Sequence, residues 1–192
     1  IGDMLGQALD LSTEAIIADD SRPLSAGQLQ AITALVARRA AREPMAQILG
    51  WREFYGRRFA VNADVLTPRP DSETVIEAAL QHFPDPAAEL RILDLGTGTG
   101  CLLLTLLAER PAASGLGIDK SSAALAIARA NAQALDLAAR VELRPGDWSQ
   151  PGWDSGLADR FDLVVANPPY IPRADLAGLA PEVRQYEPHL AL

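Results

Sequence analysis

A glycine-rich segment between a strand pattern and a helix pattern constrains this chain more than any other feature. Residues 94–100 read Asp-Leu-Gly-Thr-Gly-Thr-Gly, and apolar runs alternate with helical patterns from there to residue 166. The runs are nearly continuous, as in strands that are covered on both faces. The predicted strands are 90–95, 115–119, 140–145 and 161–166, and the predicted helices are 100–109 and 122–137. This alternation predicts an α/β fold with a doubly wound, Rossmann-like parallel sheet.

The residues before this sheet predict a small helical domain, a hairpin and one more helix. Apolar positions between residues 3 and 18 share a helical face, and Ser25 with Gln28 forms a capping box that opens a second helix. Short strand patterns on either side of Gly56 predict a β-hairpin. Asp71 is expected to cap the next helix, which runs to residue 82. The predicted units are a helical domain over 1–43, a hairpin linker over 44–70 and the α/β domain over 71–192.

Charge and composition exclude several classes of function. Lys and Arg number 17 against 25 Asp and Glu, which gives a net charge of −8 and argues against binding nucleic acid by general electrostatics. A single cysteine excludes an internal disulfide, and with only 2 histidines we expect no metal site. No apolar run approaches the ~20 residues of a transmembrane helix, and the first residues do not form a signal peptide. We therefore expect a cytoplasmic monomer that does not bind membranes and whose natural N-terminus precedes Ile1.

The glycine segment predicts a nucleoside-binding site. Ligands of doubly wound sheets bind at the carboxyl ends of the strands, where glycines let the backbone approach closely. A carboxylate that ends the second strand can accept hydrogen bonds from ribose hydroxyls, and an indole after the third strand can cover an adenine. A plain structural turn for the loop, and a core or surface aromatic for the indole, are the alternatives. The residues predicted to bind a cofactor are Gly96, Thr97, Gly98, Thr99, Gly100, Asp119, Trp148 and Asn167.

The segment Asn167-Pro168-Pro169-Tyr170 follows the fourth strand directly. Two consecutive prolines stiffen the backbone and donate no hydrogen bonds, so the carbonyl groups there are free to accept. The Asn167 side chain and the Pro168 carbonyl can hold a planar –NH₂ group toward a methyl donor, and Tyr170 offers a flat stacking surface. We expect all four residues to bind the substrate, and Asn167 and Pro168 to act in catalysis. A rigid exit from the strand is the alternative.

These motifs together resemble those of class I S-adenosylmethionine-dependent methyltransferases that act on a planar nitrogen. Three further stretches resemble the release factor glutamine methyltransferases, the HemK or PrmC family. They are Met-Ala-Gln-Ile-Leu-Gly at 45–50 with Glu-Phe-Tyr-Gly at 53–56, Thr-Pro-Arg-Pro-Asp-Ser-Glu-Thr at 67–74, and Pro-Glu-Val-Arg-Gln-Tyr-Glu-Pro at 181–188. The resemblance covers roughly residues 44–192, and the N-terminal helices fit the layout of the family.

The resemblance implies methyl transfer from S-adenosylmethionine to the side-chain amide of the glutamine in the Gly-Gly-Gln motif of class 1 peptide-chain release factors. Residues 96–100, Asp119 and Trp148 would bind the cofactor, and Asn167 with Pro168 would hold the glutamine amide. The family's sheet has seven strands and these residues supply four, so we expect a fragment that is weakly stable or aggregates in isolation.

Other functions remain open from the sequence. The Asn-Pro-Pro-Tyr motif would also serve a nucleic-acid adenine or guanine N-methyltransferase, although the net charge argues against one. A nucleotide-dependent oxidoreductase or a non-catalytic nucleoside-binding module is a further alternative, but the third glycine comes one position earlier than in the dinucleotide fingerprint. Arg69, between two prolines, either leans into the cofactor pocket or pairs with a surface carboxylate.

Overall fold

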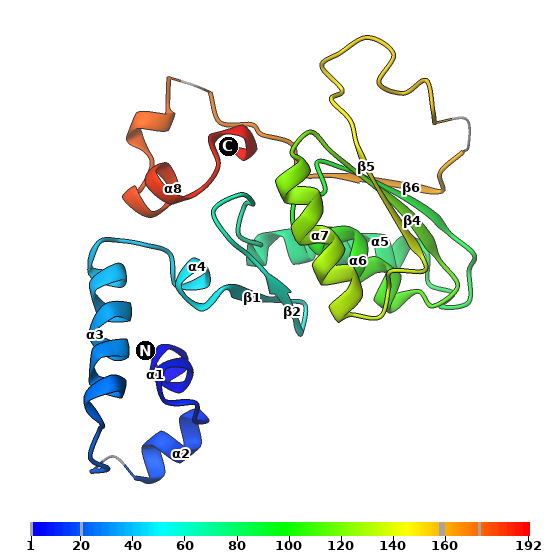
Figure 1. Cartoon of the computed structure of the whole chain (residues 1–192). Helices are drawn as coiled ribbons and strands as arrows, with labels where there is room; N and C mark the ends of the chain where they lie inside the picture. Colours follow the sequence, from blue (N-terminus) through cyan, green and yellow to red (C-terminus); the bar gives the residue numbers. More distant parts are fainter. Residues whose placement is uncertain (1, 20, 158–159, 173) are drawn as a thin grey trace.

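A four-stranded parallel sheet forms the centre of the computed structural model, which describes residues 2–19, 21–157, 160–172 and 174–192 (Figure 1). The strands lie in the order β5-β4-β3-β6, and each neighbouring pair is parallel. Their bounds are β3 Arg91–Leu95, β4 Ser114–Asp119, β5 Val141–Pro145 and β6 Leu163–Ala166. From β3 the chain adds β4 and then β5 on one side, and it then adds β6 on the other side of β3. In open α/β sheets, the crevice beside the carboxyl ends of strands at such a reversal is where ligands bind.

The two faces of this sheet are covered in different ways. Helices α6 (Cys101–Glu109) and α7 (Ser122–Ala134) pack on β3, β4 and β5, and α5 (Glu73–His82) packs on α6. Ile92 faces these helices, while its neighbour Leu93 faces the opposite side, because successive side chains of a strand alternate. That second face packs against Trp153, Leu157 and Phe161 of the β5–β6 connection.

The strands and helices predicted for residues 90–166 are confirmed, with ends that differ by at most three residues. The largest difference is at the end of α7, which was predicted to reach residue 137. Asp136 adopts a left-handed conformation with φ 58°, and the amide of Leu137 donates to the Ala132 carbonyl at 2.8 Å. These two features end the helix early, at Ala134.

The single helix predicted over residues 3–18 is wrong, because the chain forms α1 (Gly2–Leu9) and α2 (Thr13–Ala18) instead. Asp10 has a φ of 55°, and the Ser12 hydroxyl accepts a hydrogen bond from the Ala15 amide at 3.2 Å. Serine competes with helix continuation by capping a new helix in this way. The capping box that opens α3 (Ala26–Ala40) is confirmed.

The predicted hairpin linker contains the hairpin and one unpredicted helix. The strands β1 (Trp51–Phe54) and β2 (Arg57–Ala60) pair antiparallel across a turn at residues 55–56, as expected. They follow α4 (Met45–Leu49), a short helix that ends at Gly50 in a left-handed conformation, with φ 79°. The predicted domain boundaries remain a prediction.

Asp71 does not cap α5 as predicted. A 3₁₀ turn, η1 (Pro70–Ser72), precedes the helix, and Ser72 stands at the cap position without a side-chain hydrogen bond. The Asp71 carbonyl instead accepts a hydrogen bond from the Thr74 hydroxyl at 2.7 Å. The proline at residue 70 favours this tight turn because its ring fixes φ.

The C-terminal residues return to the N-terminal half of the molecule (Figure 1). They form η2 (Leu176–Gly178), α8 (Pro181–Tyr186) and η3 (His189–Ala191). The Tyr186 hydroxyl donates to the Ala41 carbonyl at 2.7 Å, and the Gln47 side-chain amide donates to the Tyr186 carbonyl at 2.7 Å. Among the described helices, none combines the length and hydropathy needed to span a membrane.

Asn131 of α7 ties the hairpin and the glycine loop together, although its side chain is buried. Its Oδ1 accepts from the Ala60 amide at 2.7 Å, and its Nδ2 donates to the carbonyls of Thr99 and Ala60 at 2.9 and 3.2 Å. Asn131→Ala leaves these buried backbone groups without partners, so the free energy of unfolding should fall by about 2–4 kcal/mol. Urea unfolding measures this. Gln133→Ala, exposed on the same helix, should change it by less than about 0.5 kcal/mol.

Candidate active site at the carboxyl ends of the strands

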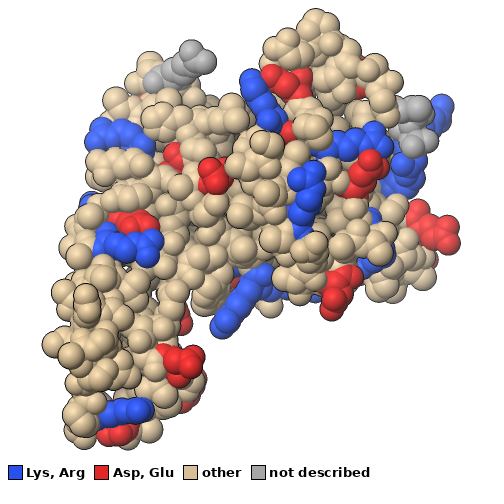
Figure 2. All heavy atoms as spheres, in the orientation of Figure 1, with Lys and Arg blue, Asp and Glu red and all other residues tan. Residues whose placement is uncertain are grey.

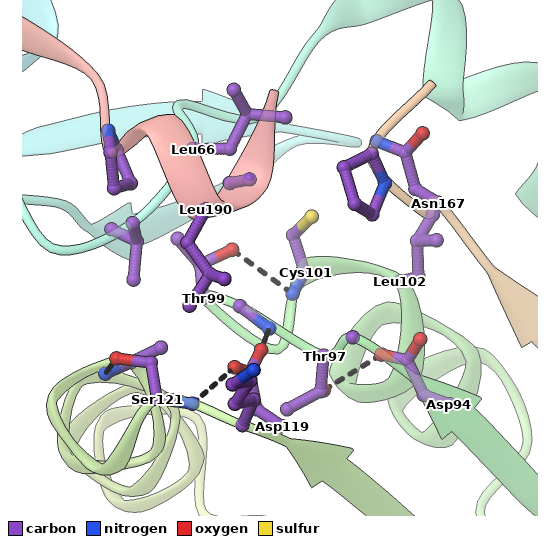
Figure 3. Close-up of a pocket in the computed structure, with 18 of the residues that line it drawn as sticks. Leu66, Asp94, Thr97, Thr99, Cys101, Leu102, Asp119, Ser121, Asn167 and Leu190 are labelled. Atoms are coloured by element: carbon purple, nitrogen blue, oxygen red, sulfur yellow. Dashed lines mark hydrogen bonds between the residues drawn. The ribbon is translucent and has the colours of Figure 1, made fainter. Parts of the chain in front are cut away.

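A cavity of about 350 Å³ lies at the carboxyl ends of β3, β4 and β6. Its volume is within the range of small-molecule sites, roughly 300–1,000 Å³. Segments far apart in the sequence form its walls, as Figure 3 shows for Leu66, Asp94, Asp119, Asn167 and Leu190. The lining residues come from 64–72, 94–102, 119–124, 147–149, 167–169 and 188–191.

The glycine loop forms the floor of this cavity. Gly96, Gly98 and Gly100 have φ values of 76°, 55° and 79°, a region that only glycine adopts without strain. Gly96 and Gly98 line the cavity together with Thr97 and Thr99, and their binding of a cofactor remains a prediction. Gly100 does not line it. A Cβ at Gly100 would lie 2.9 Å from Leu104 Cδ1, so this glycine lets the start of α6 pack closely.

Asp119 anchors the loop from the end of β4. Its Oδ2 accepts from the Gly98 amide and its Oδ1 from the Ser121 amide, both at 2.8 Å (Figure 3). Each carboxylate oxygen can accept a second hydrogen bond. Asp119 lines the cavity, so the side chain can hold the loop and bind a diol of a ligand at the same time.

Trp148 and Asp147 form the neighbouring wall. The Trp148 ring lies against the glycine loop, because a Cβ at Gly96 would meet the indole Cη2 at 3.0 Å. The Lys120 ammonium lies 2.8 Å from Asp147 Oδ2. Hydrogen bonds from Lys120 and from Ser149 lower the pKa of Asp147 to about 2, so this carboxylate is ionised at neutral pH. An ionised acceptor beside an indole suits the amino group of a purine.

Asp94 is a site residue that the sequence analysis did not single out. It is 1% exposed at the end of β3, and burial raises its pKa to about 7, although a hydrogen bond from the Thr97 hydroxyl at 2.7 Å partly offsets this. Its other oxygen, Oδ1, has no hydrogen-bond partner within the described residues. A buried carboxylate oxygen without a close partner is costly, so this oxygen is available to a ligand that donates hydrogen bonds. Its place at the head of the glycine motif is the signal that could have identified it.

The structure brings two of the four Asn-Pro-Pro-Tyr residues to the cavity. Asn167 and Pro169 line it, whereas Pro168 and Tyr170 do not. Tyr170 is 79% exposed. The following residue is held by the chain end, because the Ile171 amide donates to the Leu192 carbonyl at 2.8 Å. The cavity therefore combines the glycine loop, Asp119, Trp148 and Asn167, while the roles predicted for these residues remain predictions.

Two further walls were not predicted from the sequence, apart from Arg69 as one of two alternatives. Residues 64–69 form one, and Pro188, Leu190 and Ala191 form another. Both alternatives considered for Arg69 apply in part, because it lines the cavity and also pairs with Glu187, a carboxylate that is buried rather than on the surface. Cys101 also lines the cavity, and burial raises the pKa of its thiol to about 12.

Curated relatives match nearly the whole chain. The chain is 47% identical to a release factor glutamine methyltransferase of Rhodospirillum rubrum, over 98% of this chain and 56% of the relative. It is 49% identical to the enzyme of that name from Caulobacter vibrioides, over 98% and 64%, and 55% identical to that from Cereibacter sphaeroides, over 83% and 54%. The chain thus spans a little over half to nearly two thirds of these relatives, and the predicted resemblance is confirmed.

A solved structure supports the fold alone. The SAM-dependent methyltransferase of Agrobacterium tumefaciens superimposes with a TM-score of 0.51 at 18% identity, over 62% of this chain and 39% of that chain. The predicted methyltransferase-like α/β fold class is thereby confirmed.

Family models cover both parts of the chain. The PrmC N-terminal domain model matches residues 3–50, and the methyltransferase small domain model matches residues 72–179, more than half of the chain. The second match contains the sheet and most of the residues around the cavity. The chain therefore belongs to the methyltransferase small domain family, and the residues before that domain are similar to the PrmC N-terminal domain.

Proposed function

We propose that the full-length protein transfers a methyl group from S-adenosylmethionine to the side-chain amide nitrogen of the glutamine in the Gly-Gly-Gln motif of class 1 release factors. The observation that carries the proposal is the high identity, over most of the chain, to proteins named release factor glutamine methyltransferases. The cavity supports it, because Asn167 and the glycine loop line one space. A side-chain amide oxygen beside a nucleoside-type site suits the transfer of a methyl group to a planar nitrogen.

The residues of the cavity fit S-adenosylmethionine. The unpartnered Oδ1 of Asp94 suits the ammonium group of the cofactor, Asp119 suits the ribose hydroxyls, and Trp148 with Asp147 suits the adenine. Gly98 would bring the backbone close to the ligand, since a Cβ there would meet only the Gly96 carbonyl oxygen, at 3.9 Å. When bound, the cofactor supplies an electrophilic sulfonium methyl group.

The task of the protein's own residues is alignment. An amide nitrogen is a poor nucleophile, because its lone pair is delocalised into the carbonyl group. In the proposed step, Asn167 Oδ1 accepts one hydrogen of the substrate –NH₂ at the cavity wall. The carbonyl of Pro168, the next residue but not part of that wall, accepts the other, which favours a more tetrahedral nitrogen. This alignment would let the nitrogen accept the methyl group that the cofactor supplies, and the nitrogen would then lose one proton to water. Orientation of this kind can supply ~7–11 kcal/mol of the barrier. Pro169 would support the substrate from the cavity wall, and Tyr170 from outside it.

The proposal also covers the location, oligomeric state and partner of the protein. We infer a cytoplasmic monomer whose partner is a protein rather than nucleic acid. The net charge of −8 argues against nucleic acid as the partner. Figure 2 shows basic and acidic side chains interspersed over the visible face rather than a continuous basic surface. Nucleic-acid binding by electrostatics needs such a surface.

Methyl incorporation into a release factor tests the proposed function. The full-length protein is mixed with labelled S-adenosylmethionine and a purified class 1 release factor, and the product is measured by mass spectrometry. A second release factor carries alanine in place of the Gly-Gly-Gln glutamine. Incorporation should occur only in the first. Equal incorporation into both, or none into either, would contradict the proposal, and nucleic-acid substrates would then be tested next.

The pKa of Asp94 predicts a pH dependence of cofactor binding. At about pH 7 roughly half of the free protein carries a protonated Asp94, whereas an ammonium ligand favours the ionised form. Binding should therefore release a proton. The affinity for S-adenosylhomocysteine should rise with pH, level off above about pH 7, and fall by up to about tenfold per pH unit below it. Calorimetry in buffers of different ionisation enthalpy measures both effects.

A substitution isolates Asp94 in this pH dependence. Asp94→Asn should bind more weakly at pH 8 and lose most of the slope between pH 5 and 7. The pH dependence of folding stability has the opposite sign to that of cofactor affinity. Between its ordinary pKa of 3.8 and about 7, Asp94 binds more protons in the free folded protein than in the unfolded chain. Its contribution therefore lowers the stability of the free protein as the pH rises through this range. A slope that persists in Asp94→Asn would show that another group titrates.

A further inference from the structure

A segment near the end of the chain connects the N-terminal helices with the wall of the cavity (Figure 1). We call residues 181–191, which contain α8 and η3, the α8 segment. Pro188, Leu190 and Ala191 of this segment line the cavity. The N-terminal helices pack mainly on each other, with α1 against α2, α3 and α4. The α8 segment therefore joins them to the cavity by contacts across the fold.

Tyr186 makes two hydrogen bonds across the boundary between α8 and the N-terminal helices. Its hydroxyl donates to the carbonyl of Ala41, the residue that ends α3, and its own carbonyl accepts from the Gln47 side chain of α4, both at 2.7 Å. The two partners are 145 and 139 positions away in the sequence. These contacts therefore exist only while the α8 segment is docked on the N-terminal helices.

Glu182 adds two ion pairs to the same boundary. Its Oε1 lies 3.6 Å from Arg39 Nη2 and 3.4 Å from Arg42 Nε. All three side chains are partly exposed, and exposed ion pairs stabilise weakly and are screened by salt. A few polar contacts thus hold α8 on the end of α3, in place of a buried apolar surface.

The other side of the α8 segment is anchored in the cavity wall. Glu187, the residue after α8, is buried. Its carboxylate pairs with Arg69 at 2.6 Å and accepts from the Thr67 amide at 3.4 Å. A buried carboxylate without such partners is strongly destabilising, so the position of Glu187 depends on the wall formed by residues 64–69. The α8 segment is therefore held at one end by the cavity and at the other by α3.

The α8 segment has little stability of its own. The helix α8 has six residues and buries none of them, and a helix this short is marginal without packing. Elements with few buried contacts open locally more often than the core of a protein does. A ligand in the cavity can contact Pro188, Leu190 and Ala191 only while the segment is docked. Binding in the cavity therefore favours the docked position over the open one.

We propose that the α8 segment couples the cavity to the N-terminal helices. A ligand in the cavity holds the α8 segment in place, and Tyr186 and Glu182 transmit this to the end of α3. The inference rests on the proposed function, because the ligand is taken to be the cofactor. Coupling between two sites is reciprocal, so the contacts at α3 also raise the affinity for the cofactor. Tyr186 and Glu182 are positioning residues, since neither lines the cavity.

Hydrogen exchange followed by mass spectrometry tests this coupling in the full-length protein, with and without saturating S-adenosylhomocysteine. In the wild type, the ligand should slow amide exchange in the glycine loop and also in residues 36–42, at the end of α3. The slowing at α3 should be about fivefold or more, the lower end of typical coupling. The lining residues of the cavity begin at Asp64, so slowing at α3 reports coupling rather than direct contact with the ligand.

A conservative double variant breaks the connection and leaves the cavity lining unchanged. In Glu182→Gln with Tyr186→Phe, the slowing at α3 should fall below about twofold, while the slowing in the glycine loop persists. The dissociation constant of S-adenosylhomocysteine, measured by titration calorimetry, should rise about 2- to 10-fold, as reciprocity requires. Neither residue is fully buried, so the variant should fold. Glu142→Gln with Tyr55→Phe makes the same chemical changes outside the cavity lining and the α8 segment and should behave like the wild type.

The outcomes distinguish this inference from the proposed function. If the wild type does not bind S-adenosylhomocysteine, the cofactor assignment fails and this inference fails with it. If the ligand binds but slows exchange only around the cavity, the proposed function stands and the coupling is overturned. The coupling is also overturned if the double variant keeps the slowing at α3 or the wild-type affinity, or if the control variant loses that slowing. Slowing at α3 that is lost in the double variant alone, together with a raised dissociation constant, supports the inference.

Discussion

Asn167→Ala is expected to lower the turnover number for methyl transfer about 100- to 1,000-fold, the effect typical of removing one preorganised hydrogen-bonding group from an active site. Asn167 lines the cavity from the end of β6, where its acceptor would hold the substrate nitrogen in line with the methyl group. This hydrogen bond gains strength as the nitrogen becomes tetrahedral. The loss should therefore appear mainly in the turnover number rather than in the Michaelis constant of the release factor.

The measurement is steady-state methylation of a release factor, with the affinity for S-adenosylhomocysteine measured separately. Because Asn167 would also contact the cofactor, we expect that affinity to fall, but by less than about tenfold. Gln133→Ala, on the exposed side of α7, is the control and should retain wild-type turnover. If Asn167→Ala instead raised only the Michaelis constant, Asn167 would contribute to binding but not to alignment.

Asp119→Ala is expected to weaken cofactor binding by about 100-fold or more, through two effects. The substitution removes the proposed acceptors of the ribose hydroxyls, and hydrogen bonds to a charged group contribute roughly 1.5–3 kcal/mol. It also releases the Gly98 and Ser121 amides, which both donate to this carboxylate at 2.8 Å. The glycine loop, which forms the floor of the cavity, therefore loses the hydrogen bonds that hold it, in addition to the loss of the contacts with the ribose.

Comparison with Asp119→Asn separates these two effects. Asparagine keeps one acceptor oxygen and loses the charge, so it should retain part of the loop anchor and bind the cofactor with intermediate affinity. Calorimetric titration with S-adenosylhomocysteine gives both dissociation constants, and circular dichroism checks that each variant is folded. Wild-type affinity in Asp119→Ala would show that the carboxylate only supports the loop and that the ribose is bound elsewhere.

Local sequence signals determined the elements of the fold. The capping box at Ser25, the alternating apolar runs and the glycine loop each act through neighbouring residues, and the structure confirms them. Where two local signals compete, the prediction from the sequence was wrong. Ser12 fits an apolar helical face by its spacing but caps α2 through its hydroxyl. Pro70 favours a 3₁₀ turn that displaces the expected cap at Asp71.

The candidate site, too, could be predicted only in part from local patterns. The positions of Asp119, Trp148 and Asn167 beside the cavity could be predicted, because Asp119 ends a strand and the other two follow strands. The carboxyl ends of parallel strands lie at one edge of the sheet. Gly100, Pro168 and Tyr170 belong to the same motifs but do not line the cavity, since a motif does not show which side its members face. Glycine 100 instead relieves a close contact with Leu104.

The sequence by itself determined the parallel α/β class, the glycine loop and the family resemblance, because these depend on local patterns along the chain. Only the tertiary structure decided the raised pKa of Asp94, which results from burial, and the pairing of Arg69 with Glu187 across 118 positions. Burial and long-range contacts depend on how separate segments pack, and packing has no local signature. That is the physical reason why the cavity wall at the strand ends could be predicted, whereas the walls formed by residues 64–69 and 188–191 required the folded chain.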